Sequence, residues 1–164
     1  MNRRTVFGLI GLAASAYAKP AARDRFIGVW KLVSSQRKYN DGRVENPYGD
    51  NPVGRIVYDK AGRLSAQLMR PDRRSTVPSG GIFTADHPSA EEIREAARGY
   101  FAYFGNFDID EASTTVIHHV QACLVPSWVG MDQKRTYRLY SNRLALTFAA
   151  PDYTNELVWE REPD

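Results

Sequence analysis

The sequence is poor in the residues that build metal and nucleotide sites. Its 164 residues include one cysteine and three histidines, and none of them stands in a spacing typical of zinc ligands. His118 and His119 are adjacent, and adjacent side chains of a strand point to opposite faces, so the two cannot chelate one ion. Glycine-rich phosphate-binding loops are also absent. We therefore expect neither a metal nor a cofactor.

Other common chemistries lack their signatures as well. There is no Gly-x-Ser-x-Gly nucleophile motif. Cys123 has no second cysteine for a disulfide within the chain, and its apolar surroundings favour a buried thiol over a nucleophile. The formal charge of +3 includes Arg3 and Arg4 at the N-terminus, and no basic stripe with interleaved aromatics is present. Nucleic acid is therefore not an expected partner.

Residues 1–18 have the organisation of an export signal. A basic start is followed by an apolar run over residues 6–14 and by Ala16-Tyr17-Ala18, a small-x-small cleavage site. The paired Arg3 and Arg4 resemble a twin-arginine signal, and a Sec signal is the alternative. The apolar run is too short to span a bilayer, so no membrane span is expected after its removal. We predict a periplasmic or secreted protein, with a short linker over residues 19–25 and one domain over residues 26–162.

The rest of the chain has the pattern of an all-β, mainly antiparallel domain. Residues 29–36 alternate, with Trp30, Leu32, Ser34 and Gln36 on one side. Residues 55–70 predict a hairpin, and short strands with tight turns fill the second half. About eight strands are expected, which indicates a sandwich or a closed barrel. A closed barrel of this size can enclose one small ligand.

Two segments interrupt the strands. Residues 71–88 form a long polar loop with three prolines, which predicts either a lid over a site or a plain disordered excursion. Residues 89–104 predict the one α-helix, with Ser89 and Glu92 as a capping box, an apolar face that includes Ile93, and Gly105 as its stop. The aromatic residues at the end of this segment are interpreted as packing.

If the strand around the histidine pair belongs to a barrel, one of the two must point inward. An inward histidine could act as an acid or base, or could be a buried polar group satisfied by hydrogen bonds. Arg70 and Arg135, at strand ends, could offer a charged fork to a carboxylate ligand, with surface arginines as the plainer interpretation. The candidate ligand-binding residues are Tyr58, Gln67, Met69, Tyr100, His118, His119, Trp128, Arg135 and Tyr137.

Several segments together resemble the bacterial and fungal lipocalin-like domain family. They are "GVWKLVS", "NPVGRIVYDKAGRLSAQLMRP", "GYFAYFGNFDID", "VIHHVQACLVPSWVGMDQKRTYRL" and "LVWER". The resemblance covers nearly all of residues 26–161 and implies a lipocalin-type antiparallel barrel with one helix against it. It implies no set of catalytic residues. Relatives of this barrel type bind apolar small molecules or catalyse isomerisations and cyclisations.

Three functions are consistent with these observations. The leading hypothesis is an exported lipocalin-like barrel that binds a small apolar or amphipathic molecule. The alternative is a cofactor-independent isomerase or cyclase that uses His118 or His119, whichever faces inward, as its acid or base. A third is an interaction or stress-response module whose barrel is filled by its own side chains. The sequence does not set the oligomeric state.

Overall fold

A computed structural model describes residues 21–74 and 89–163 of the chain. In chain order its elements are α1 (Ala22–Phe26), β1 (Gly28–Tyr39), β2 (Val44–Glu45), β3 (Val53–Tyr58), β4 (Arg63–Met69), α2 (Ala90–Ala97), β5 (Tyr100–Asp110), β6 (Thr115–Cys123), the 3-10 helix η2 (Pro126–Trp128), β7 (Asp132–Leu139), β8 (Arg143–Ala149) and β9 (Tyr153–Arg161).

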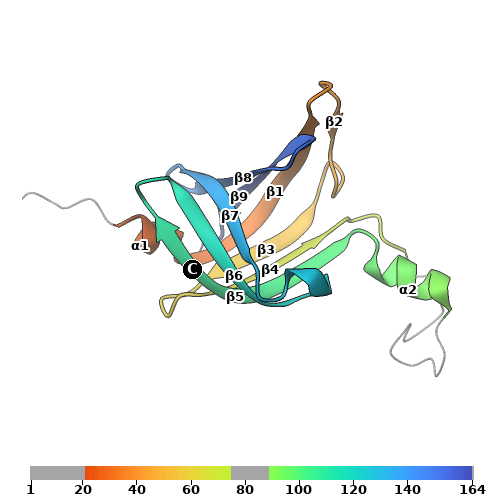
Figure 1. Cartoon of the computed structure of the whole chain (residues 1–164), viewed down its shortest axis with the longest axis horizontal. Coiled ribbons are helices and arrows are strands. Elements are labelled where there is room, and N and C mark those ends of the chain that lie inside the picture. Colours follow the sequence, from red (N-terminus) through yellow and green to blue (C-terminus); the bar gives the residue numbers. More distant parts are fainter. Residues whose placement is uncertain (1–20, 75–88, 164) are drawn as a thin grey trace, which may run out of the picture.

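The strands form one closed antiparallel barrel (Figure 1). Strand β1 pairs with β3, each later strand pairs with the next, and β9 returns to pair with β1. The two-residue strand β2 extends the other edge of β1 through a hairpin. The barrel proper therefore has eight strands, β1 and β3 to β9, which confirms the expected fold. Closure pairs every strand of the barrel on both sides, so none is left as an open edge.

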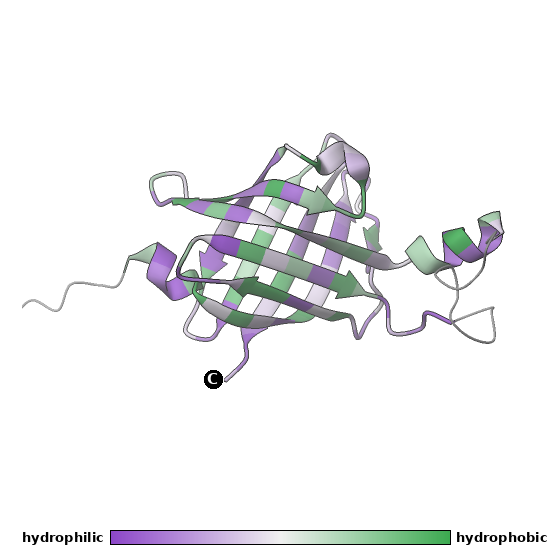
Figure 2. Cartoon of the chain, turned by 90° about the horizontal axis from the view of Figure 1, so that it is seen from below, coloured by the Kyte–Doolittle hydropathy of each residue, from purple (hydrophilic) through white to green (hydrophobic). Residues whose placement is uncertain are grey.

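Alternation of side chains separates the core from the surface. Along β4, Leu64, Ala66 and Leu68 are buried inside the barrel while Gln67 between them is exposed. Figure 2 shows the same alternation of hydrophobic and hydrophilic residues along the crossing strands. Period-two patterning is what a sheet with one buried face requires.

A β-bulge in β1 shifts this alternation and corrects the pattern read from the sequence. Leu32 pairs with Trp159, but the next pair joins Ser34 to Val158, so Val33 is an extra residue. Trp30 and Leu32 are buried before the bulge, and Ser35 is buried after it. Ser34 and Gln36, expected on the side of Trp30, thus leave the inner face, because one inserted residue reverses the alternation. The same shift turns Arg37 inward.

A second bulge lies between β5 and β6. Gly105 pairs with Val120 and Phe104 pairs with Ala122, which leaves Gln121 unpaired. After it, Cys123 packs against the core as a half-buried side chain, although alternation alone placed it opposite. Gly105 lies within β5 and is not the expected helix stop. A Cβ atom added there would lie 1.9 Å from the carbonyl oxygen of His119, so only glycine fits this crossing.

The predicted helix over residues 89–104 is shorter than expected. The capping box of Ser89 and Glu92 is present, but α2 ends at Ala97 and Gly99 takes a left-handed φ of +66°. The aromatic segment that follows belongs to β5, because aromatic side chains suit a pleated, half-buried strand that pairs with β4. No residue of α2 is buried, and Ile93 of its expected apolar face is 49% exposed.

Helix α1 closes one end of the barrel. The Phe26 side chain is fully buried and packs edge-on against Tyr58 and Tyr137, with ring centroids 5.2 and 5.0 Å away. The indole N–H of Trp30 donates to the Phe26 carbonyl oxygen at 2.8 Å. Part of the segment expected as a linker, residues 19–25, is thus helical and packed. The opposite end of the barrel is the one left open.

Two predicted segments fall outside the described residues. They are the export signal, residues 1–18, and most of the loop over residues 71–88. Within the described residues, no helix combines the length and the apolar character needed to cross a membrane.

Candidate ligand-binding cavity

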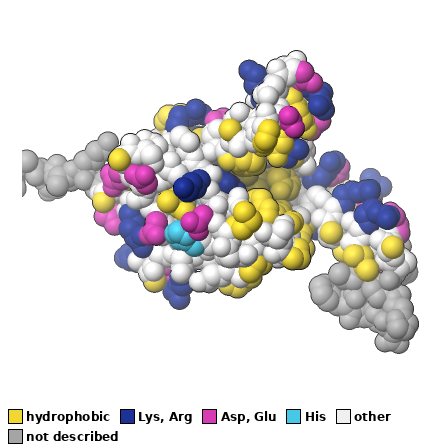
Figure 3. Space-filling model, in the orientation of Figure 1, with side chains coloured by type: hydrophobic (Ala, Val, Ile, Leu, Met, Phe, Trp, Pro, Cys, Tyr) yellow, Lys and Arg dark blue, Asp and Glu magenta, His cyan; other side chains and the backbone are white. Residues whose placement is uncertain are grey.

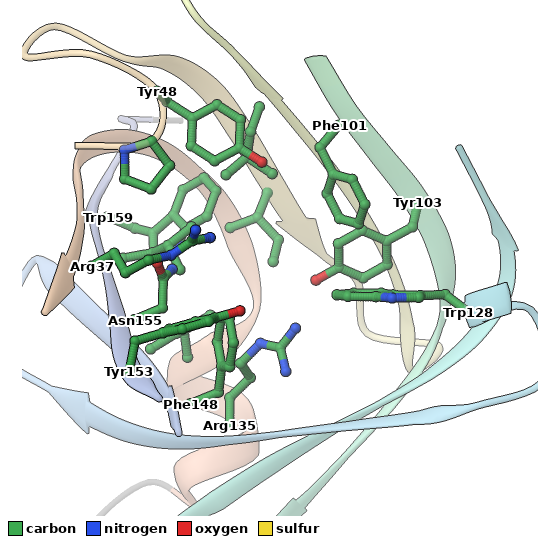
Figure 4. Close-up of a pocket in the computed structure, with 15 residues that line it drawn as sticks. Arg37, Tyr48, Phe101, Tyr103, Trp128, Arg135, Phe148, Tyr153, Asn155 and Trp159 are labelled. Carbon is green, nitrogen blue, oxygen red and sulfur yellow. The ribbon is translucent and has the colours of Figure 1, made fainter. Parts of the chain in front are cut away.

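A cavity of about 220 Å³ lies inside the barrel, at the end away from α1. Figure 3 shows hydrophobic side chains gathered around the hollow at this end. Seven of the fifteen residues in its wall are aromatic, and they are Tyr48, Phe101, Tyr103, Trp128, Phe148, Tyr153 and Trp159 (Figure 4). A concave apolar site with a few polar groups is the usual form of a small-molecule site.

Aromatic contacts fix the shape of these walls. Trp128 packs edge-on against Phe101, with ring centroids 5.0 Å apart, and lies 6.2 Å from Tyr103. On the facing wall, Phe148 and Tyr153 pack edge-on at 6.2 Å. These edge-to-face arrangements are the favoured geometry for aromatic pairs, so the walls are preformed. The 3-10 helix η2 places Trp128 at the rim, and the Pro126 ring at its start fixes the backbone there.

Two arginines reach the cavity from opposite strands. Arg135 of β7 is only 7% exposed, and its guanidinium carbon lies 4.7 Å from the centre of the Phe148 ring. Arg37 of β1 lies in the same way over Tyr153, at 4.3 Å. Stacking on an aromatic face attracts a guanidinium group and leaves the N–H bonds along its edge available.

Three polar atoms in the cavity wall are buried and have no partner among the described residues. They are Arg37 Nε, Asn155 Oδ1 and Trp159 Nε1. Buried polar groups are nearly always hydrogen-bonded, and leaving one unsatisfied costs about 1–3 kcal/mol. They lie on one wall, formed by β1 and β9, which therefore has unsatisfied hydrogen-bonding capacity.

Below the cavity, His118 is held between two tyrosines. The Tyr58 hydroxyl lies 2.9 Å from its Nε2 atom and the Tyr103 hydroxyl lies 2.8 Å from its Nδ1 atom. His118 is fully buried, and burial, followed by the nearby charge of Arg135, lowers its pKa well below the usual value of 6.5. Burial also raises the pKa of Tyr103 to about 12. All three groups are therefore neutral near pH 7.

Counting protons orients this chain of hydrogen bonds. A neutral imidazole has one N–H and one acceptor nitrogen, so together with two hydroxyls it brings three protons to two hydrogen bonds. The unused proton suits Tyr103, which lines the cavity, and not Tyr58, which is 1% exposed and lies away from it. In this arrangement Tyr58 donates to Nε2 of His118, Nδ1–H of His118 donates to Tyr103, and the Tyr103 O–H points toward the cavity.

The family model for the lipocalin-like domain matches residues 27–161. The chain belongs to this lipocalin-like domain family. A similar protein is the 4′-hydroxy-3′-methoxypropiophenone carrier protein of Aspergillus oryzae, which is 29% identical over 112 residues. The aligned stretch covers 61% of this chain and 97% of the fungal protein.

In this lipocalin-like domain the two adjacent histidines have opposite surroundings. His119 lies on the outer surface, where its Nδ1 atom is 2.6 Å from Asp132 and its Nε2 atom is 3.0 Å from Asp108. The hydrogen bond with Asp132, and then that with Asp108, raises the pKa of His119. Alternation along β6 required one inward and one outward histidine, and the register with β5 makes His118 the inward one.

The other sequence-predicted residues divide between the cavity and the outer face. Trp128 and Arg135 line the cavity. Gln67, Met69 and Tyr100 lie on the outer face instead, because their strand neighbours Leu68 and Phe101 point inward.

Two further candidates lie elsewhere. Tyr137 is buried at the closed end against Phe26. Arg70 forms an ion pair with Asp72, at 2.6 Å, outside the cavity, so of the two arginines proposed as a charged fork only Arg135 is in place.

Several wall residues were not among the candidates. Arg37 was missed because the bulge at Val33 was not predicted, and Tyr48 because it lies in a proline-rich connection. Phe101 and Tyr103 of β5 were missed because the aromatic residues of that segment were interpreted as packing. The last two strands supply Phe148, Tyr153, Asn155 and Trp159. One signal could have found the wall residues of the last strand. Tyr153, Asn155 and Trp159 stand at alternate positions of residues 153–159, and alternate residues of a strand share one face.

A second depression lies beside α1 and includes Tyr137, Arg25 and Glu111. It is larger, at about 470 Å³, but it is a surface hollow, and its Arg25 and Glu111 side chains are already paired. Glu111 accepts from the Ala22 amide, and Arg25 donates to the Leu139 carbonyl. We therefore place the candidate site in the barrel. Among the described residues, no cluster of three His, Cys, Asp or Glu side chains is arranged to hold a metal.

Proposed function

We propose that this lipocalin-like domain carries a small, mainly apolar molecule in the cavity of its barrel. The observation that supports this most directly is an aromatic cavity of about 220 Å³ with buried polar atoms that lack partners in its wall. A cavity filled by a ligand would satisfy those atoms and remove the wall from water. The similarity to a fungal carrier protein supports the same class of function.

The fungal relative suggests a first ligand to test. Its name gives 4′-hydroxy-3′-methoxypropiophenone as its cargo, an aromatic ketone with a phenolic hydroxyl. Such a molecule offers a ring for the aromatic walls and oxygens for the N–H groups of Arg37 and Trp159. The cargo of this chain is proposed to be of this general kind, small and aromatic.

The test measures thermal unfolding with this propiophenone and a panel of hydrophobic ligands, and native mass spectrometry for bound species. We expect a rise in the unfolding temperature with at least one ligand, because a molecule that binds only the folded state stabilises it. Leu146→Trp, inside the cavity, should abolish the rise, whereas Leu139→Trp, near the closed end, should not. No shift with any ligand and no bound species would contradict the proposal.

The geometry disfavours the enzymatic alternative. His118, the inward histidine, does not line the cavity, and both its nitrogens are engaged by tyrosine hydroxyls. It reaches a ligand only through the hydroxyl of Tyr103. His119 faces outward. The filled-barrel alternative is disfavoured by the cavity itself.

Export is part of the proposal and has its own support in residues 1–18. The basic start, apolar run and small-x-small site predict cleavage after Ala18, so the mature chain should begin at Lys19. Mass spectrometry of the protein from periplasm or medium tests this, with Arg3→Lys/Arg4→Lys as the variant that separates twin-arginine from Sec export. An intact N-terminus found only in the cytoplasm would argue against export.

A further inference from the structure

Among the described residues, the cavity wall holds two arginines and no acidic side chain. Neither Arg37 nor Arg135 forms an ion pair with a carboxylate in the described ranges, whereas surface arginines such as Arg138 and Arg143 do. Arg135 is also one of the few buried charged residues. A buried cation without a carboxylate partner, such as Arg135, is unfavourable, and a protein that keeps one beside the half-buried Arg37 has a use for it.

The aromatic walls hold the faces of these guanidinium groups and leave their edges free. Phe148 and Tyr153 lie under Arg135 and Arg37 respectively, and the two rings pack against each other. The one hydrogen bond from the Arg135 side chain within the described residues goes to the Lys134 carbonyl oxygen, at 3.1 Å. The Nε–H of Arg37 has no acceptor in the part of the chain that the structure describes. N–H donors of both groups are thus available to a ligand.

The groups beneath the cavity do not supply the missing negative charge. His118 is neutral, because burial and the charge of Arg135 lower its pKa, and Tyr103 is neutral because burial raises its pKa to about 12. The other polar side chains of the wall are tyrosines, tryptophans and an asparagine, which carry no formal charge near pH 7. The described wall therefore gives the cavity a positive potential, which a bound anion would balance.

We propose that the ligand is an organic anion, with an aromatic or apolar body and a carboxylate as its charged end. Arg37 and Arg135 supply the opposite charge, and the aromatic walls hold the body. Figure 4 shows both arginine side chains directed into the cavity between the aromatic rings. The planar guanidinium edge matches a carboxylate with two parallel hydrogen bonds. This inference rests on the proposed carrier function and specifies the chemistry of its cargo.

The test compares two probes of nearly the same shape, trans-cinnamate and trans-cinnamamide, by isothermal titration calorimetry at neutral pH. A carboxyl group with a pKa near about 4 is ionised there, whereas the amide stays neutral. Because hydrogen bonds to charged groups contribute about 1.5–3 kcal/mol, we expect cinnamate to bind at least about tenfold more tightly. Arg37→Gln and Arg135→Gln should each reduce this preference, and the double variant should abolish it.

Controls separate charge recognition from folding and from the carrier function. Arg138→Gln, a surface arginine paired with Glu156, should leave the preference unchanged. Retained cinnamamide binding in the Gln variants shows that the cavity is intact. Equal affinity for acid and amide in the unmodified protein, or an unchanged preference in the double variant, would overturn the anion inference while leaving the carrier function in place. Binding of neither probe, nor of any ligand in the hydrophobic panel, would overturn both.

Discussion

His118 and His119 are neighbours in the chain, yet the fold gives them opposite protonation behaviour. His118 is buried between Tyr58 and Tyr103, and its pKa falls well below 6.5. His119 lies outside between Asp132 and Asp108, and its pKa is raised. A histidine held neutral by the fold and one held protonated affect stability with opposite signs as the pH changes.

The first prediction follows from these signs. The His118 contribution is present above its unfolded pKa of about 6.5 and is lost as the pH falls, because the unfolded state then binds the proton more readily. The His119 contribution is present below about 6.5 and is lost as the pH rises through its raised pKa. On acidification from about pH 8 to about pH 5.5, the urea midpoint of His119→Gln should therefore fall more than that of the unmodified protein.

His118→Gln should show the reverse, with a midpoint that falls less or rises over the same range. An NMR titration gives an independent check, since the His119 ring should titrate above 6.5 and the His118 ring should not titrate while the protein is folded. The same pH slope in both variants would show that the assigned environments are wrong.

The second prediction concerns Trp159, whose indole N–H has no partner in the described residues. Trp30 is its matched control, because it is equally buried but donates to the Phe26 carbonyl. Trp→Phe removes similar volume at both positions, so Trp30→Phe should lower the free energy of unfolding by about 1 kcal/mol more, the value of one hydrogen bond. Only Trp159→Phe should weaken ligand binding, by about three- to tenfold. Urea unfolding and calorimetry measure the two effects, and equal losses of affinity would exclude a role for the Trp159 N–H.

For single residues, the sequence indicated which polar side chains the barrel contains better than it indicated which face of the sheet each one lies on. That one of two adjacent histidines points inward follows from strand alternation alone, but the choice of His118 depends on its register with β5. Of the polar candidates, Arg135 lines the cavity, whereas Gln67 lies on the outer face. A single residue of register decides such cases, and the residue types do not carry that information.

At the scale of elements, two β-bulges account for most of what the sequence did not predict. An extra residue at Val33 turns Arg37 inward, and one at Gln121 turns Cys123 toward the core. Bulges depend on how two distant strands meet and have little local signature. The predicted end of the helix was wrong for a related reason. The aromatic segment from Tyr100 onward pairs with β4 and is therefore a strand. Strand existence, set by local alternation, was predictable.

The third prediction tests the bulge at Gly105. Replacement by alanine would place a Cβ atom 1.9 Å from the carbonyl oxygen of His119, which is backbone and cannot swing away. We expect Gly105→Ala to lower the free energy of unfolding by at least about 2 kcal/mol, in the upper range for overpacking. Gly130→Ala is the control, since nothing lies within 4 Å of its added Cβ and only its φ of +81° opposes the change. Its cost should stay near about 1–2 kcal/mol in urea titrations. A Gly105→Ala protein as stable as the unmodified one would mean that β5 and β6 cross differently.

At the scale of the whole molecule, the barrel divides into a packed half and a hollow half. Phe26 and its neighbours fill the end near α1, and the wall residues leave the other end open. The sequence predicted the closed eight-stranded barrel, because strand number, spacing and family resemblance all agree on it. The cavity was expected only as a possibility of such barrels, since whether side chains fill an interior depends on where distant strands bring them together.

This division predicts that the residues which bind the ligand make the ligand-free protein less stable than a variant with an apolar side chain in their place. Arg135 is a buried cation without a carboxylate partner in the described residues, and its alkyl stem packs where an apolar side chain of similar length would fit. Arg135→Met should therefore raise the free energy of unfolding of the ligand-free protein by about 1 kcal/mol or more, because removing an uncompensated buried charge is stabilising. For a domain of this size that raises the unfolding temperature by about 2–4 °C.

The same variant should have a reduced preference for cinnamate over cinnamamide, so stability and binding would change in opposite directions. Arg138→Met is the matched control, because Arg138 is exposed and pairs with Glu156, and its stability should change by less than about 0.5 kcal/mol. Differential scanning calorimetry without and with cinnamate measures both the stability and the effect of the ligand. Cinnamate should stabilise the unmodified protein more than it stabilises Arg135→Met. If Arg135→Met proved less stable without ligand, the guanidinium group would be part of the structural core, and its positive charge would be balanced within the protein.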